Sequence, residues 1–221
     1  MHTSHLTSLT QAIISGEELY LHPDKAIFYP AEQTLIVSDL HLGKADHFRK
    51  AGIPVPDQVN ITNIEKLYTL ILELEPERVI FLGDLFHSDL NGSWIDFEKV
   101  LTDFQDTQFD LVRGNHDILP DAVYANSRMK LYNETLNLGP FVLSHIPLEE
   151  PSEGYNLAGH IHPAVVMKGK ARQHLRIPCF YFSENQGILP AFGAFTGTYR
   201  MRPEGDDQVY VVSAEKVIRV R

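Results

Sequence analysis

The sequence predicts an α/β fold in which two β-sheets pack together and helices cover the outside. In the first half, short apolar runs alternate with amphipathic patterns of helical period, as in parallel strands joined by crossover helices. In the second half, strand-like runs follow one another with little helical periodicity, which indicates a second sheet. The 221 residues contain no repeat, low-complexity segment or linker-like stretch, so we expect a single domain over residues 1–221.

The first half supplies the alternation. Buried strands are expected at 34–38, 78–82 and 109–113, where β-branched and other apolar residues run together. A helix is expected over 58–75, because apolar residues recur every three or four positions until Pro76. A second amphipathic helix is expected over 93–104, with Ser93 as its N-cap.

The second half is expected to be mostly strands. They are predicted near 130–136, 140–144, 154–158, 174–182, 188–192 and 208–220. Together with the first half, this pattern predicts two sheets rather than one large one.

Composition narrows the functional classes. The hydrophobic fraction of 43% and charged fraction of 22% are those of an ordinary globular protein. We expect a cytoplasmic protein that does not bind membranes, since no signal-peptide pattern or apolar run of membrane-spanning length is found, and the single cysteine, Cys179, suits a reducing compartment. The net charge of −10 argues against extensive non-specific binding along duplex nucleic acid.

Two short basic stretches stand out in this acidic chain. One holds Lys44, Arg49 and Lys50, and the other holds Lys168, Lys170, Arg172 and Arg176. Such stretches are often solvated surface. Each follows a group of candidate metal ligands, however, so a basic rim around a site is the alternative.

Polar residues follow five of the apolar runs at the point where each expected strand ends. These groups are Asp39-Leu40-His41, Gly83-Asp84 with His87, Gly114-Asn115-His116-Asp117, His145, and Gly159-His160-Ile161-His162. In open α/β sheets, ligands bind beyond the carboxyl ends of the strands, so these residues are expected to converge. The mixture of carboxylate, imidazole and amide oxygen suits Mn, Fe or Zn better than Mg or Ca.

The ordered set D-x-H, G-D, G-N-H-D, H and G-H-x-H resembles the calcineurin-like metallophosphoesterase superfamily over roughly residues 34–195. The resemblance implies a four-layer α/β/β/α sandwich and two divalent metal ions, most simply Mn²⁺, with Fe or Zn as alternatives. It assigns one ion to Asp39, His41, Asp84 and His162. The second ion would be held by Asp84, as a bridge, together with Asn115, His145 and His160.

Longer strings point to one branch of that superfamily. The strings SDLHLGKADHFRKAGIPVP, HIHPA, IPCF and ILPAFGAFTG are similar to the bacterial ligase-associated DNA damage response endonucleases. The resemblance implies a phosphodiesterase or endonuclease acting on DNA or a nucleotide-like diester.

A mechanism follows as a hypothesis. Two ions, two carboxylates and a metal-bridging hydroxide would give a site of about +1, which suits a phosphodiester, and the hydroxide would attack in line. His116 is the candidate general acid for the leaving oxygen, with Asp117 orienting its ring. His87 is close enough to Asp84 to face the site, where it is a candidate to bind the substrate or to support a metal ligand.

Basic side chains complete the expected site. Lys44, Arg49 and Arg172 are candidate phosphate contacts, with solvated surface as the alternative for both arginines. The expected substrate is a phosphodiester, in particular single-stranded DNA or DNA ends, brought by a DNA repair protein.

Two other functions stay open. One is a phosphomonoesterase or pyrophosphatase acting on a nucleotide-sugar or lipid precursor. The other is a non-catalytic scaffold that keeps the fold, which the presence of all the motif histidines disfavours.

Overall fold

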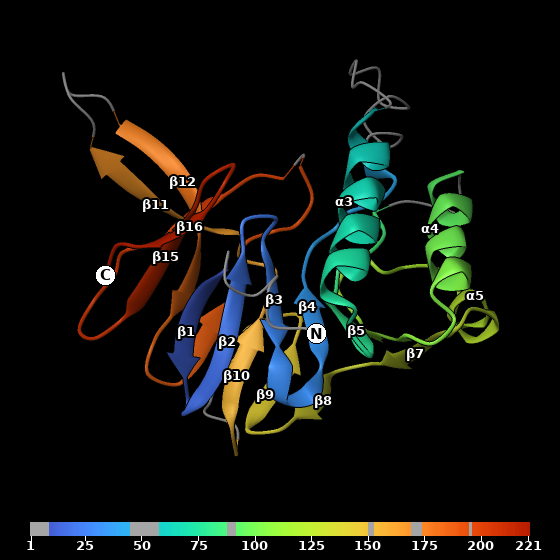
Figure 1. Cartoon of the computed structure of the whole chain (residues 1–221), viewed down its shortest axis with the longest axis horizontal. Helices are drawn as coiled ribbons and strands as arrows, with labels where there is room; N and C mark the ends of the chain where they lie inside the picture. The colour runs from blue at the N-terminus through green and yellow to red at the C-terminus, as the bar shows by residue number, and fades with distance from the viewer. Residues whose placement is uncertain (1–8, 45–57, 88–91, 150–152, 169–173, 195) are drawn as a thin grey trace.

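A computed structural model of the chain shows two mixed β-sheets packed face to face, with helices on one side (Figure 1). It describes residues 9–44, 58–87, 92–149, 153–168, 174–194 and 196–221, with the side chains of 58–60 excepted. None of the described helices has the length and hydropathy that a membrane crossing requires.

The first sheet has seven strands in sequence order. They are β1 (Thr10–Ile14), β2 (Glu17–His22), β3 (Ala26–Tyr29), β4 (Thr34–Val37), β5 (Arg78–Leu82), β6 (Gln108–Val112) and β7 (Met129–Tyr132). The first four pair antiparallel, whereas β4 to β7 are parallel. The parallel strands therefore all end at the same edge.

The second sheet has nine strands and a different order. They are β8 (Thr135–Leu138), β9 (Phe141–Ser144), β10 (Tyr155–Ala158), β11 (Pro163–Lys168), β12 (His174–Phe182), β13 (Gln186–Ile188), β14 (Tyr199–Arg200), β15 (Gln208–Val212) and β16 (Val217–Arg219). The path is β14-β11-β12-β13-β10-β9-β8, and β15 and β16 join beside β12. Strands β9, β10 and β13 are parallel.

Alternation along the strands builds two hydrophobic cores. On β4, Leu35 and Val37 face the helices, whereas Ile36 faces the second sheet. The helical core packs α3 (Gln58–Leu74), α4 (Gly92–Asp103) and α5 (Asp121–Asn126) on the first sheet. A one-turn helix, η1 (Pro30–Glu32), connects β3 to β4.

The α/β class with two mixed sheets is confirmed, and the described residues supply three of the four expected layers. The outer face of the second sheet carries a small apolar cluster instead of a described helix. That cluster contains Val165, Cys179, Tyr181, Val209 and Val211. A described helix is absent from this face because apolar residues in the second half of the sequence do not recur every three or four positions.

The expected elements of the first half are confirmed to within a residue or two. However, α4 begins at Gly92, so Ser93 lies inside the first turn and is not the N-cap. The expected strand 130–136 is two strands, because β7 belongs to the first sheet and β8 to the second. The expected strand 208–220 is a hairpin of β15 and β16. The expected strand 188–192 is wrong beyond its first residue, because β13 spans Gln186–Ile188. The prediction missed β1 to β3, β11, β14 and α5.

The core between the sheets yields a stability prediction. Phe180 is fully buried there, so Phe180→Ala is expected to lower the free energy of unfolding by about 3–5 kcal/mol. The matched control is Leu72→Ala on α3, whose side chain is 58% exposed and should cost no more than about 0.5 kcal/mol. Urea unfolding measures both. A single transition is expected if residues 1–221 form one domain, and equal effects of the two substitutions would contradict the assigned core.

Candidate metal centre

The carboxyl ends of five strands bring the motif residues together. Asp39 follows β4, Asp84 follows β5, Asn115 follows β6, His145 follows β9 and His160 follows β10. Backbone hydrogen bonds join neighbouring loops, with the N–H of Asp39 donating to Gly83 O and that of His41 to Asp84 O. The convergence expected from the sequence is therefore present.

The first group of ligands is Asp39, His41 and His162. One candidate ligand atom from each lies within 4.8 Å of the others. Asp39 Oδ1 is 3.1 Å from His162 Nε2 and 3.9 Å from His41 Nε2. Asp39 and His41 are buried, whereas His162 is half-buried.

The second group is Asp84, His145 and His160, again within 4.8 Å. His145 Nε2 lies 3.3 Å from Asp84 Oδ1, 3.1 Å from His160 Nδ1 and 3.0 Å from Asn115 Oδ1. Its other nitrogen, Nδ1, donates to Leu82 O at 2.9 Å, because a carbonyl can only accept. Nε2 therefore carries the lone pair and points at the cluster.

Asp84 lies between the two groups. Its Oδ1 faces His145, and its Oδ2 is 3.8 Å from His41 Nε2 in the first group. A carboxylate with one oxygen toward each group has the arrangement that a ligand shared by two ions needs.

The residues present fit metal ions. Asp39 Oδ1, His41 Nε2 and His162 Nε2 are buried, and none of them forms a well-aligned hydrogen bond with the described residues, although Asp39 Oδ1 and His162 Nε2 are only 3.1 Å apart. Leaving buried polar atoms unpaired is costly, and a shared cation would satisfy all three. Burial, aided by the charge of Lys44, lowers the pKa of His41 to about 3, so its ring is neutral and available as a ligand.

The backbone of the ligands is unusual. Five of them have positive φ, namely Asp39 (55°), His41 (49°), Asp84 (49°), His160 (65°) and His162 (53°). The left-handed conformation costs an L-residue roughly 1–2 kcal/mol. Strain concentrated on the candidate ligands is a mark of a functional site that the surrounding structure holds in place.

Two glycines allow the loops to approach. Gly83 has φ 71°, and a Cβ there would lie 2.3 Å from His145 Nδ1. A Cβ on Gly114 would lie 2.2 Å from the backbone nitrogen of Asp84. At both positions, close approach between motifs requires the absence of a side chain.

Sequence reasoning missed a second set of supports. Asn63, buried on α3, donates from Nδ2 to Leu40 O at 3.3 Å and accepts from the N–H of Ala194 at 3.1 Å. Nearby, the Gly193 N–H donates to Asp39 O. These bonds connect the first ligand loop to the ILPAFGAFTG segment. In the sequence that segment was marked only by its similarity to a family, because it contains no side chain that would suggest a catalytic or metal-binding role.

His116 lies beside the metal ligands. Its backbone N–H donates to Asp84 Oδ1 at 2.9 Å, and its ring is 5.7 Å from that of His41, centre to centre. The His87 ring is 4.1 Å from that of His116 and 5.1 Å from that of His41. The three imidazoles therefore form one group, which brings His87 into the site.

Comparisons with known proteins agree with this geometry. The sequence profile of calcineurin-like phosphoesterases matches residues 33–185. The chain belongs to this family. It is also similar to the solved nuclease MPE of Pseudomonas putida, with 30% identity over 96% of this chain and 100% of that chain, and a TM-score of 0.80. The phosphoesterase Yfce from E. coli shares 13% identity over 85% of this chain and 97% of that chain, with a TM-score of 0.45. No curated protein sequence matches.

In this calcineurin-like phosphoesterase, Asp117 links the loops that follow β5 and β6 by hydrogen bonds. Its Oδ1 accepts from the N–H of Phe86 at 3.0 Å and its Oδ2 from that of Gly114 at 2.8 Å. Burial raises the pKa of Asp117 to about 6, although both hydrogen bonds oppose the shift. The expected contact with the His116 ring stays a prediction, since the bonds above join Asp117 to backbone.

Of the candidate phosphate contacts, Lys44 lies at the site. Its backbone N–H donates to His41 O at 3.2 Å. Burial lowers the pKa of its ammonium, while the charges of Asp84 and Asp39 act to raise it. Arg49 and Arg172 lie outside the described residues, so their roles stay predictions.

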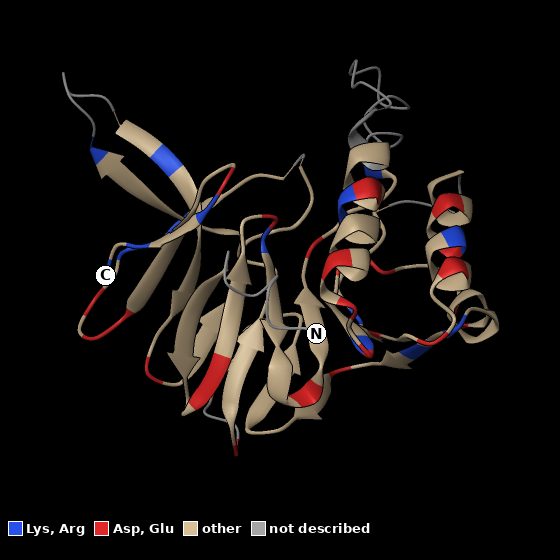
Figure 2. Ribbon diagram, in the orientation of Figure 1, with Lys and Arg blue, Asp and Glu red and all other residues tan. Residues whose placement is uncertain are grey.

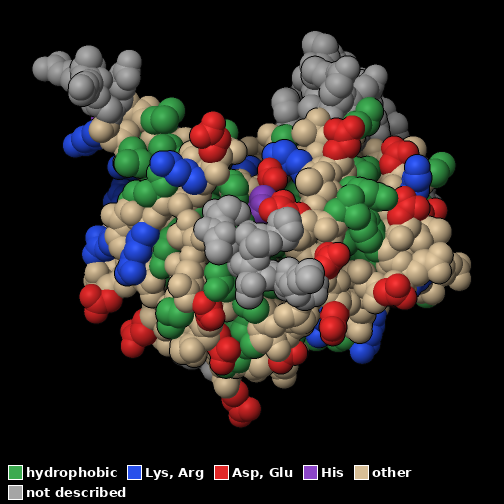
Figure 3. All heavy atoms as spheres, viewed as in Figure 1, with side chains coloured by type: hydrophobic (Ala, Val, Ile, Leu, Met, Phe, Trp, Pro, Cys, Tyr) green, Lys and Arg blue, Asp and Glu red, His purple; other side chains and the backbone are tan. Residues whose placement is uncertain are grey.

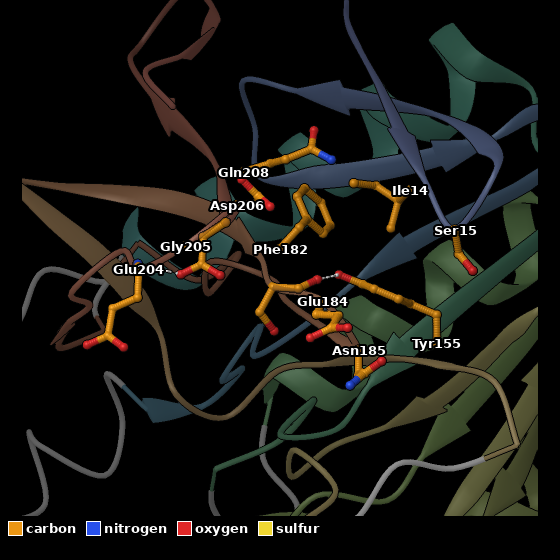
Figure 4. Close-up of a pocket in the computed structure, with 12 residues that line it drawn as sticks. Ile14, Ser15, Tyr155, Phe182, Glu184, Asn185, Glu204, Gly205, Asp206 and Gln208 are labelled. Atoms are coloured by element: carbon orange, nitrogen blue, oxygen red, sulfur yellow. Dashed lines mark hydrogen bonds between the residues drawn. The ribbon is translucent and has the colours of Figure 1, made fainter.

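A separate pocket of about 850 Å³ lies at the opposite end of β10 (Figure 4). Tyr155, which opens β10, lines it together with the β12–β13 turn, whereas His160 follows the other end of that strand. The carboxylates of Glu184, Glu204, Asp206 and Asp207 also line it. This charge repels phosphate, and the pocket contains none of the candidate metal ligands.

The close approach at Gly83 gives a prediction. Gly83→Ala is expected to displace His145, reduce the metal content per chain and destabilise the fold. The matched control is Gly205→Ala, which also has positive φ (49°) but no atom within 4 Å of the added Cβ, so it should cost only about 1 kcal/mol and keep full metal content. Metal analysis after gel filtration measures the difference. Full metal content in Gly83→Ala would contradict the assigned contact.

Proposed function

We propose that this calcineurin-like phosphoesterase is a two-metal phosphodiesterase that cuts single-stranded DNA or DNA ends. The observation that carries the proposal is the position of Asp84 between two ligand groups, with His116 bonded to the same carboxylate. We further propose that Mn²⁺ fills both positions, that the protein works in the cytoplasm, and that a DNA repair protein delivers the substrate.

The donor set supports the metal part of the proposal. One ion would be held by Asp39, His41 and His162. The other would be held by His145, His160 and Asn115. Asp84 would be a ligand of both ions. Bound there, such ions lower the pKa of water from 15.7 towards about 7 and neutralise charge on the phosphate. Nitrogen and oxygen ligands together favour Mn, Fe or Zn.

The protein's own groups supply proton transfer and positioning. His116 is half-buried beside the ligands, so its ring can donate a proton to the leaving oxygen as the ester bond breaks. The hydrogen bond from its backbone to Asp84 fixes the distance between that ring and the metal centre. Lys44 and His87 border the same space and would bind the non-bridging phosphate oxygens.

The choice of a nucleic acid diester has two supports. The similar protein from Pseudomonas putida is described as a nuclease. A site of about +1 also matches a diester better than a doubly charged monoester. The net charge of −10 favours short single strands over long duplex, because tracking along a duplex requires many cations.

The role of His116 can be tested by changing the leaving group. His116→Ala is expected to lower kcat on DNA about 10²–10⁴-fold while metal content is unchanged. The loss should be smaller with an activated p-nitrophenyl diester, because that leaving group needs little protonation. Wild-type rates on both substrates would show that His116 is not the acid, and an equal loss on both would indicate charge stabilisation instead.

The metal requirement gives a second test. Chelation is expected to abolish hydrolysis and lower the melting temperature, and Mn²⁺ should restore both, since ions that bind only the folded state stabilise it. The substrate panel contains activated mono- and diesters, cyclic nucleotides, and single- and double-stranded DNA. Faster turnover of monoesters than of any diester would favour a phosphomonoesterase, and no turnover of any substrate by the metal-loaded protein would favour a scaffold.

A further inference from the structure

The ribbon formed by β11 and the first half of β12 projects beyond the body of the molecule (Figure 1). It begins at Pro163, directly after the metal-ligand candidate His162. Strand β14 pairs with its base, with Pro163 opposite Tyr199 and Ala164 opposite Arg200. The ribbon is therefore continuous with the metal centre.

The two faces of the ribbon differ in chemistry. On one face, Val165 and Met167 are paired with Ile177 and Leu175, and these apolar side chains continue the small cluster on the outer face of the sheet. The other face carries the cations. Its exposed side chains include Lys168, Arg176, Arg200 and His174.

The cations on that face lie at increasing distances from His162 along the ribbon. Arg200 is level with Ala164, Arg176 is level with Val166, and Lys168 comes two residues further along β11. Two residues of strand correspond to about 6.6 Å along the strand axis, so Arg200, Arg176 and Lys168 lie at successive levels leading away from His162. They also lie on three neighbouring strands, β14, β12 and β11, so together they form a basic patch across the width of the ribbon.

Hydrogen bonds link the basic face to the ligand loop. Arg176 Nη1 donates to Thr198 O at 3.2 Å. The preceding carbonyl, Gly197 O, accepts from His162 Nδ1 at 3.2 Å, and the N–H of Tyr199 donates to His162 O. Arg176 and Arg200 are thus held in a fixed relation to His162.

Charge is distributed unevenly along the chain. Residues 165–221 contain nine of the 19 Lys and Arg residues but only five of the 29 Asp and Glu residues. Figure 2 shows Lys and Arg on the ribbon, whereas α3 and α4 carry acidic residues together with a few basic ones. Figure 3 shows several Lys and Arg side chains gathered on the ribbon side of this face. An anionic polymer would therefore be attracted to the ribbon side of the molecule.

We propose that the basic face of the β11–β12 ribbon binds the phosphates next to the scissile one in a single-stranded nucleic acid, with Arg200, Arg176 and Lys168 each contacting one phosphate. The inference rests on the proposed function, because it takes the metal centre as the place where the strand is cut. It also explains how an acidic protein binds an acidic polymer, since only a short row of phosphates is engaged.

The test removes two charges while keeping polar side chains. Arg176→Gln/Arg200→Gln is compared with Lys99→Gln/Lys130→Gln, which removes the same charge from exposed positions on the helical side. Fluorescence anisotropy with an oligothymidylate of about 20 nucleotides and chelator-treated full-length protein measures binding without turnover. In the ribbon variant, Kd is expected to rise about tenfold and the slope of log K against log salt to fall by about 1.4, or about 0.7 for each phosphate contact.

Turnover then separates the ribbon from the metal centre. With Mn²⁺, the ribbon variant should lose about tenfold in kcat/KM on the long oligonucleotide but keep wild-type kcat/KM on bis-p-nitrophenyl phosphate. Wild-type affinity and slope in the ribbon variant, or an equal loss in the control, would overturn the inference.

The proposed function can fail separately from the ribbon. Ribbon-dependent binding of DNA that the wild type never cuts would leave the ribbon inference standing and refute the nuclease. If the wild type cuts DNA and the ribbon substitutions change neither binding nor cutting, the nuclease proposal stands and the ribbon inference is refuted.

Discussion

The structure depends on the burial of two carboxylates and several imidazoles at the edge where the strands of both sheets end. Asp39 and Asp84 are almost fully buried, and their oxygens face the nitrogens of His41, His145 and His162. Such a cluster is unfavourable by itself, because buried charges and unpaired ring nitrogens lose their hydration. Divalent cations bound to the two ligand groups would reverse that balance. Fold stability and chemistry are therefore coupled at this edge.

The left-handed ligands need support, and it comes from residues that are not ligands themselves. Asp117 joins the loops after β5 and β6 by two backbone hydrogen bonds. Asn63 reaches from α3 to the first ligand loop, so the helical layer also fixes Asp39 and His41. The hydrophobic cores on both faces of the first sheet hold the strands from which these loops emerge. Hydrogen bonds and packing from several layers therefore converge on the site.

The sequence predicted the parts of this structure that have local signals. Asp39, Asp84 and His160 follow apolar runs directly, so their convergence could be expected from strand topology alone. Asn63 and Asp117 act through backbone groups distant in sequence, and no local pattern reports such partners. The strand β11 was missed because only its first residues are buried. The rest lies on an exposed ribbon, where a strand does not need the apolar pattern that identifies buried strands in a sequence.

Reaction and specificity have separate physical origins in this protein. In the proposed mechanism the ligand groups would act only on the reacting phosphate, so any phosphate ester of suitable charge could react there. Selection of a nucleic acid over other phosphate esters would therefore depend on groups further from the reacting phosphate. Because the protein as a whole is acidic, those groups would have to be local clusters of Lys and Arg. The ribbon provides one, because pairing of β11 with β12 and β14 places side chains from three segments of the sequence on one face. Its apolar opposite face continues the cluster around Val165 and Cys179, which anchors the ribbon to the second sheet. The same strands thus link substrate binding to the core that supports the metal ligands.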